Sequence, residues 1–327
     1  MAGSQASGLG RTSAGRRRAA FTLVSLVVCS CVAAAESAPG LVVTFLGTTS
    51  ALISDGETTL MTDGYFSRVA IGKTPESWVI RPDVPAIDAA LKSLSPGPVA
   101  AVFVVHSHFD HAMDAPVVAE RTGALLVGSA STANVGRGLG LPEKQLRVVS
   151  PGEQLQFGKF TVHFYRSKHY PLGEPLATAM LGNTIDTPLV PPVRFDAYKE
   201  GTTFSILFEH PTGNLLLHGS AGYLPGAVLL GTGGLGDLPR AEQEAYYREV
   251  VLATGAKQLF PVHWDVMSTP YSAPLVPDTD FQRSMSFLTE MNAAHGVQLA
   301  WLPKGEPVLL GLRRGSPCAM PVSPQQP

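Results

Sequence analysis

The motif that says most about the fold of this chain is His106-Ser107-His108-Phe109-Asp110-His111. It follows residues 100–105, six small or apolar residues that predict a strand buried on both faces. Three imidazoles and one carboxylate within six positions repel each other when charged and lack partners when buried, unless a cation gathers them. A polar loop with solvated histidines is the plain alternative, but it does not account for this density. The stretch therefore predicts a metal site at the end of a rigid central strand.

Two later histidines also follow predicted strands. His169 comes after a strand predicted over residues 160–165, and His263 comes after one over residues 258–262. A histidine at such a place can join a site built at strand ends. By contrast, His210 stands beside a turn, and we expect it to be a solvated turn residue.

Two more polar residues end predicted strands, and each has two interpretations. Asp63 closes an early strand over residues 58–62 and is either a site residue or a plain turn aspartate before a glycine. His218 closes a strand over residues 214–217 and is more often a core hydrogen-bonding residue than a metal ligand.

With these residues the sequence resembles the metallo-β-lactamase fold metallohydrolase superfamily, whose signature is His-x-His-x-Asp-His. Residues 44–48 and 61–64 favour the branch with lactonases and phospholipase-D-like phosphodiesterases over the true β-lactamases. The resemblance implies that Asp63 does not bind the metal itself but hydrogen-bonds a histidine ligand and steadies it. It also implies two metal positions: a first with His106, His108 and His169, and a second with Asp110, His111 and His263.

One residue departs from the family pattern. The family supplies a bridging aspartate after a later hairpin, and this chain has Ser220 there. A neutral hydroxyl is a much poorer ligand for a dication than a carboxylate. We therefore expect one tightly bound zinc ion and a second that is weak or absent, with His218 as a substitute ligand to consider. Iron and manganese stay open as alternatives to zinc.

A metal with an open coordination position activates water, and Asp110, if it is not bound to a second metal, can orient that water and take its proton. The expected activity is therefore metal-dependent hydrolysis of an ester, lactone, amide or phosphodiester in a small-molecule substrate. Two alternatives stay open: a member of the fold that binds a ligand without turnover, and a mononuclear iron oxygenase.

The body of the chain alternates predicted strand hairpins with helices, without repeats or an internal linker. This pattern predicts an α/β protein, an αβ/βα four-layer sandwich of two mixed sheets with helices on the outer faces. We expect one metallo-β-lactamase-like domain over residues 36–315 and a flexible tail over 316–327. The proline-rich span after His169, to about residue 200, is expected to form a lid over the site.

The first 35 residues predict a signal peptide. Four arginines precede an uncharged, largely apolar stretch over residues 19–35 that ends in three alanines. An uncleaved membrane anchor and a lipoprotein with Cys31 lipidated are the alternatives, and they provide the only expected contact with a membrane. We therefore expect export to the periplasm or the extracellular space. The net charge of −2 gives no electrostatic footprint for nucleic acid.

Overall fold

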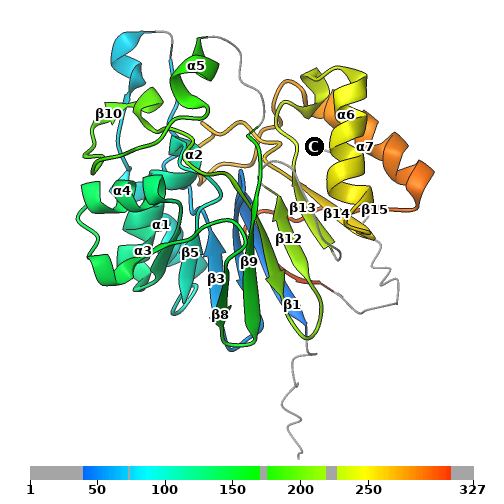
Figure 1. Cartoon of the computed structure of the whole chain (residues 1–327), viewed down its shortest axis with the longest axis horizontal. Coiled ribbons are helices and arrows are strands. Elements are labelled where there is room, and N and C mark those ends of the chain that lie inside the picture. Colours follow the sequence, from blue (N-terminus) through cyan, green and yellow to red (C-terminus); the bar gives the residue numbers. More distant parts are fainter. Residues whose placement is uncertain (1–39, 73, 170–174, 219–226, 311–327) are drawn as a thin grey trace, which may run out of the picture. The chain divides into compact units, whose positions relative to one another are not determined.

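The computed structural model describes residues 40–72, 74–169, 175–218 and 227–310. Within these ranges the chain forms two large mixed β-sheets with helices on their outer faces (Figure 1). The predicted signal peptide, Cys31, Ser220 and the predicted tail over residues 316–327 lie outside the described residues. In the described part, none of the helices has the length and apolar composition needed to cross a membrane.

The first sheet has the strand order β16-β1-β2-β3-β5-β6-β7. Its strands are β1 (Leu41–Gly47), β2 (Ser50–Ser54), β3 (Thr59–Thr62), β5 (Ala101–Phe103), β6 (Leu125–Gly128), β7 (Leu146–Val148) and β16 (Pro307–Leu310). The strands from β16 to β3 are antiparallel, whereas β3, β5, β6 and β7 run parallel. The parallel half delivers the ends of its strands to one edge, where the histidine motif follows β5.

The second sheet has the order β15-β14-β13-β12-β11-β9-β8. Its strands are β8 (Gln154–Phe157), β9 (Phe160–Arg166), β11 (Phe204–Glu209), β12 (Leu215–His218), β13 (Ala227–Gly231), β14 (Gln258–Val262) and β15 (Gln298–Leu299). The strands from β12 to β15 pair in parallel, and the others are antiparallel. We had predicted the other long strands of this sheet, but not β13.

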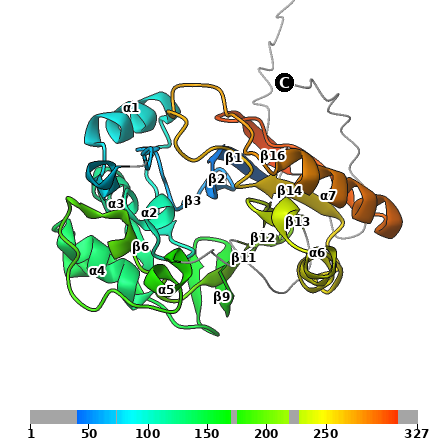
Figure 2. The ribbon, with the colours of Figure 1, turned by 90° about the horizontal axis from the view of Figure 1, so that it is seen from above.

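The helices are α1 (Val84–Leu94), α2 (Phe109–Ala112), α3 (Ala115–Thr122), α4 (Ala130–Gly138), α5 (Leu176–Met180), α6 (Arg240–Tyr247) and α7 (Phe281–His295), with a π-helical turn over Arg248–Leu252 and 3₁₀ turns over Pro75–Trp78, Glu143–Gln145, Phe195–Ala197 and Leu235–Asp237. Helices α1, α3 and α4 pack on the outer face of the first sheet, and α6 and α7 on that of the second. A two-stranded ribbon pairs β4 (Val79–Ile80) with β10 (Val193–Arg194). Figure 1 shows α1 and α3 on one side of the sandwich and α6 and α7 on the other, and Figure 2 shows the same arrangement from above.

Three apolar clusters correspond to the three interfaces between these four layers. One cluster joins the first sheet to α1 and α3 through residues such as Val102, Ile87 and Val118. A second fills the space between the sheets, and a third joins the second sheet to α6 and α7. The predicted αβ/βα four-layer sandwich is therefore confirmed.

The central strand is shorter than predicted. β5 covers Ala101–Phe103, whereas the sequence predicted a strand over residues 100–105. Val104 and Val105 are still buried: the amide of Val104 donates to the carbonyl oxygen of Val127 on β6, whereas the amide of Val105 donates to a side chain, Asp63 Oδ1. The backbone turns here toward the site, which apolar pattern alone does not show.

Candidate metal centre

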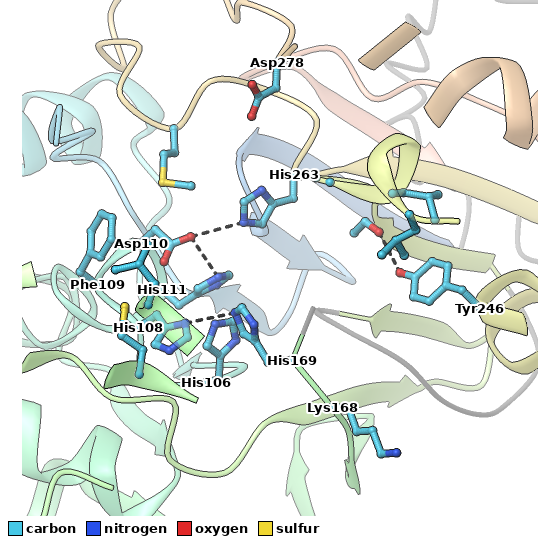
Figure 3. A pocket seen from close by; sticks show the side chains of 18 of the residues that line it. His106, His108, Phe109, Asp110, His111, Lys168, His169, Tyr246, His263 and Asp278 are labelled. Carbon is cyan, nitrogen blue, oxygen red and sulfur yellow. Dashed lines mark hydrogen bonds and ion pairs between the residues drawn. The ribbon is translucent and has the colours of Figure 1, made fainter. Parts of the chain in front are cut away.

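The histidine motif is positioned by the end of β5 and by the short helix α2. His108 is the residue that precedes α2, and its carbonyl accepts from the amide of Ala112 at 2.8 Å. The end of β5 and this one-turn helix together bring the side chains of His106, His108, Asp110 and His111 close to one another (Figure 3). His263 joins them from the end of β14, and His169 from the segment after β9.

The first group consists of His106, His108 and His169. Each offers one ring nitrogen, and these three nitrogens lie within 4.8 Å of one another. His108 Nδ1 and His169 Nε2 are 3.1 Å apart, and the rings of His106 and His169 cross edge to face with centroids 4.6 Å apart. His106 and His108 are buried.

The second group consists of Asp110, His111 and His263, whose ligand-type atoms also lie within 4.8 Å of one another. Asp110 Oδ2 stands between the two rings, 3.2 Å from His111 Nε2 and 3.3 Å from His263 Nε2. All six residues named for the two expected metal positions are therefore brought together, three to each group.

The first group has the properties of a cation site. Both ring nitrogens of His106 and Nε2 of His108 are buried without a hydrogen-bond partner. Burial lowers the pKa of His106 well below its usual range and that of His108 to about 3, and neighbouring imidazoles contribute to both shifts. Neutral imidazoles with unused lone pairs are what a divalent metal requires. The residues present thus fit the metal.

The second group is strongly coupled. Burial raises the pKa of Asp110, but His111 and His263 outweigh it and hold that pKa well below its usual range. Burial lowers the pKa of His111, whereas Asp110 and Asp63 outweigh it and raise that pKa to about 10. A cation that enters this group competes with the proton on His111.

Asp63 lies behind His111, not in a plain turn. Its Oδ2 is 2.9 Å from His111 Nδ1 and also accepts from the hydroxyl of Thr49. Thr49 Oγ1 itself lies 2.9 Å from His111 Nδ1. These contacts fix the orientation of the His111 ring, whose Nε2 faces Asp110.

His218 lies apart from both groups, so the structure does not support the suggestion that it replaces a ligand. Along β12, Leu215 and Leu217 face the space between the sheets, whereas Leu216 and hence His218 face the outer helices. His218 Nδ1 bonds Ser205 Oγ at 2.9 Å, and its ring packs on Tyr246. The alternation of the strand therefore turns it away from the metals.

His210 is also not the solvated residue that we expected. It is buried, with Nε2 3.3 Å from Asp55 Oδ2 and Nδ1 2.8 Å from Thr212 Oγ1. Its partner Asp55 is 155 positions away in the sequence, so local pattern could not show the contact.

A cavity of about 760 Å³ opens above the two groups. Apolar side chains make most of its wall: Ile71, Phe109, Leu176, Met180, Phe195, Leu235, Leu238 and Met267. Four charged residues also line it, namely Lys168, Glu242, Glu249 and Asp278. Leu176, Met180 and Phe195 come from the span predicted as a lid, so the described part of that span does lie over the site.

Sequence reasoning missed several residues that shape the centre. Thr49 had a weak signal, because it belongs to a Gly-Thr-Thr turn after a predicted strand. Arg68 and Asp265 form a buried ion pair of 2.7 Å next to this turn, and nothing in the sequence links two residues 197 positions apart.

The comparisons with known proteins agree with this geometry. The family model of the metallo-beta-lactamase superfamily matches residues 43–259. Because this match covers more than half of the chain, the chain belongs to that superfamily.

A curated relative and two solved structures add to this. A UPF0173 metal-dependent hydrolase of Myxococcus xanthus (strain DK1622) is 33% identical over 94 residues, which are 29% of this chain and 31% of that protein. The match thus spans about a third of the relative's length. Igni18, a metallo hydrolase of Ignicoccus hospitalis KIN4/I, is 15% identical with a TM-score of 0.50, over 83% of this chain and 98% of that chain.

The second structure is a variant of the β-hydroxylase CmlA, from Streptomyces venezuelae, which is 14% identical with a TM-score of 0.50 over 84% of this chain and 55% of that chain. At such identities the structural likeness shows the fold alone. The family match places the chain in the metallo-β-lactamase superfamily, and its activity and substrate have to be argued from the site.

Proposed function

We propose that this chain is an exported, zinc-dependent hydrolase of a neutral, largely apolar carboxylic ester, lactone or amide. The observation that carries the proposal is the position of two three-residue ligand groups in the wall of one mostly apolar cavity. Membership of the superfamily supports metal-dependent hydrolysis. Export rests on the sequence of residues 1–35, and a single domain over residues 36–315 is part of the same proposal.

The ligand sets favour unequal metal affinities. His106, His108 and His169 offer three nitrogens and leave a fourth position open, which is the usual set of a catalytic zinc. Asp110, His111 and His263 would hold a second and weaker ion, because Ser220 replaces the family's bridging carboxylate. When bound, the metal polarises the scissile carbonyl and lowers the pKa of the attacking water.

The protein's own groups do the remaining work. Asp110 stays a carboxylate at neutral pH, because His111 and His263 overcome the effect of burial on its pKa. At the cavity wall its oxygens can accept the proton of the attacking water. Phe109, Met180 and Phe195 exclude bulk water and contact the apolar part of the substrate.

The charges of the cavity favour a neutral substrate over a phosphodiester. Outside the two ligand groups, Glu242, Glu249 and Asp278 carry negative charge, and Lys168 is the one basic residue among the described lining residues. Away from the metal positions these carboxylates repel an anionic substituent, whereas a neutral acyl compound meets no such repulsion.

The test uses the full chain, purified without added metal and then analysed for bound elements. Zinc is then added, and turnover is measured with p-nitrophenyl esters, lactones, bis-p-nitrophenyl phosphate and nitrocefin. We expect bound zinc, and ester or lactone turnover that exceeds phosphodiester turnover by at least about tenfold. Preference for the phosphodiester would overturn the substrate class. Bound iron without hydrolysis would indicate an oxygenase, and bound metal without any turnover a binding protein.

The control for this test is His163→Ala. His163 is a histidine on β9 whose Nε2 pairs with Glu209 at 2.9 Å, away from both ligand groups. Its removal should leave metal content and turnover unchanged. A loss of either would show that the assay reports on histidine number or on folding instead of on the site.

A further inference from the structure

The turn between β1 and β2 contacts both histidines of the second group. The carbonyl oxygen of Thr48 accepts from the amide of His263 at 2.8 Å. Next to it, Thr49 Oγ1 lies 2.9 Å from His111 Nδ1. One short turn therefore sets the backbone of one expected ligand and the ring orientation of another.

A buried ion pair fastens this turn. Arg68 Nη1 lies 2.7 Å from Asp265 Oδ2, and both side chains are completely buried. Asp265 Oδ1 accepts from the amide of Thr48 at 2.9 Å, and Arg68 Nη2 donates to the carbonyl oxygen of Leu46 at 3.1 Å. The pair thus joins the turn to the segment that directly follows His263.

Gly47 shows how closely the turn and the arginine fit. A Cβ on Gly47 would lie 1.7 Å from Arg68 Nη2, closer than any side chain allows. Gly47 also has a φ of +100°, which L-residues rarely adopt. Glycine is required here because the guanidinium crosses directly over the backbone.

The backbone around this network is held in unfavourable conformations. Five non-glycine residues of the described chain have positive φ: Thr48, Asp63, Arg68, Ser95 and His263. Ser95 ends helix α1. The other four belong to the Thr48-Thr49 turn, to the ion pair or to residues that contact this turn. Such conformations persist only where surrounding contacts impose them. A buried ion pair contributes little net stability, because the cost of desolvating two charges offsets their attraction. The ion pair and the positive-φ residues together therefore indicate that this region positions the turn.

We propose that Arg68 and Asp265 are positioning residues for the second metal position. Through the Thr48-Thr49 turn they hold His263 and His111 at the spacing that a cation needs opposite Asp110. In the described part of the chain, none of these contacts to the turn or the ion pair involves His106, His108 or His169, so the pair should act on one metal and not on the other. This inference rests on the proposed function in one respect, which is that the two groups bind metal.

The experiment titrates the metal-free full chain with Co²⁺ and follows the visible spectrum of each equivalent. The wild type should bind two equivalents. Arg68→Met should weaken the second equivalent about 10- to 100-fold, as outer-shell changes do, and leave the affinity of the first within about twofold. Gly47→Ala should have the same effect, because it displaces the guanidinium. The affinity of Arg68→Lys for the second equivalent should lie between those of the wild type and Arg68→Met. A lysine ammonium cannot bond Asp265 and Leu46 at once, as the planar guanidinium does.

Tyr247→Phe is the control for general destabilisation. It removes a buried hydrogen bond of 2.6 Å to Asn292 in the layer of α6 and α7, outside the metal groups. It should lower the melting temperature and leave both affinities unchanged.

The outcomes separate the two proposals. No binding by the wild type refutes the metal centre itself. A single wild-type equivalent, equal loss of both equivalents in Arg68→Met, unchanged binding in that variant, or the same loss in Tyr247→Phe each refutes the positioning role and leaves the hydrolase proposal standing.

Discussion

The two ligand groups differ in how the protein satisfies their polar atoms. In the first group, both ring nitrogens of His106 are buried without a partner. In the second, His111 is bonded to Asp63, and the backbone of His263 to Thr48. A buried imidazole without partners costs free energy until a cation binds it, whereas a supported imidazole has its place before any cation arrives. The first group therefore depends on metal, and the second on the protein around it.

The largest expected effect comes from removing a ligand of the first group. His106→Ala should abolish binding of the tighter metal and lower kcat/KM on the order of a thousandfold or more, because the activated water is lost. Elemental analysis and ester hydrolysis measure the two effects. An active variant with full metal content would show that the first group is not the catalytic one.

Removing the metal should come next, in a stability measurement. A ligand present at 100 times its dissociation constant stabilises the native state by about 2.7 kcal/mol. In a domain of this size that corresponds to a decrease of about 5 °C in the melting temperature after chelation. The decrease should become smaller in His106→Ala, which keeps only the second ligand group, and persist in full in His163→Ala. A melting temperature that does not respond to chelation would mean that His106 is satisfied without metal.

The sequence predicted the four layers from local pattern, and the two groups from the motif, the strand-end histidines and what the superfamily resemblance implies. Strand periodicity located β5 and β14, and the motif at the end of β5 supplied four of the six residues. The supporting contacts were beyond its reach, since Arg68–Asp265 and His210–Asp55 join residues more than 150 positions apart. The side of the sheet on which His218 lies depends on the register of β12, because a shift of one residue moves every side chain of a strand to the opposite face.

His218 is a third kind of buried histidine, different from those of the two ligand groups. Its Nε2 is buried without a partner, as in His106, but it stands outside both groups. Burial lowers its pKa from 6.5 to about 3. The unfolded chain therefore binds the proton first, and this histidine costs stability as pH falls from 6.5 toward 3.

The change that tests this is His218→Gln. As pH falls from 7 to 5.5, the wild type should lose on the order of 1 kcal/mol of unfolding free energy that the variant keeps. Any cost of the substitution itself should be the same at both pH values. Denaturant unfolding of metal-free protein at both pH values measures the difference. If the difference between the two proteins does not change with pH, then His218 has a partner that keeps its pKa ordinary.

The smallest expected effect concerns Ser220, which lies outside the described residues, so the prediction rests on its place in the sequence. Ser220→Asp restores the carboxylate that the superfamily resemblance places between two metals. An added negative charge next to two cations should raise the affinity of the weaker metal, since carboxylates are strong ligands for dications. We expect a gain of a few-fold to about tenfold for the second equivalent, and no change for the first. Activity need not rise, because a new ligand can also hold the attacking water too firmly.

The measurement is the same Co²⁺ titration, with Ser220→Asn as the control of equal size and no charge. If Ser220→Asn gains as much as Ser220→Asp, the effect is not electrostatic. If the unmodified chain already binds both equivalents with equal affinity, then the unequal dependence of the two groups on the surrounding protein does not extend to their affinities.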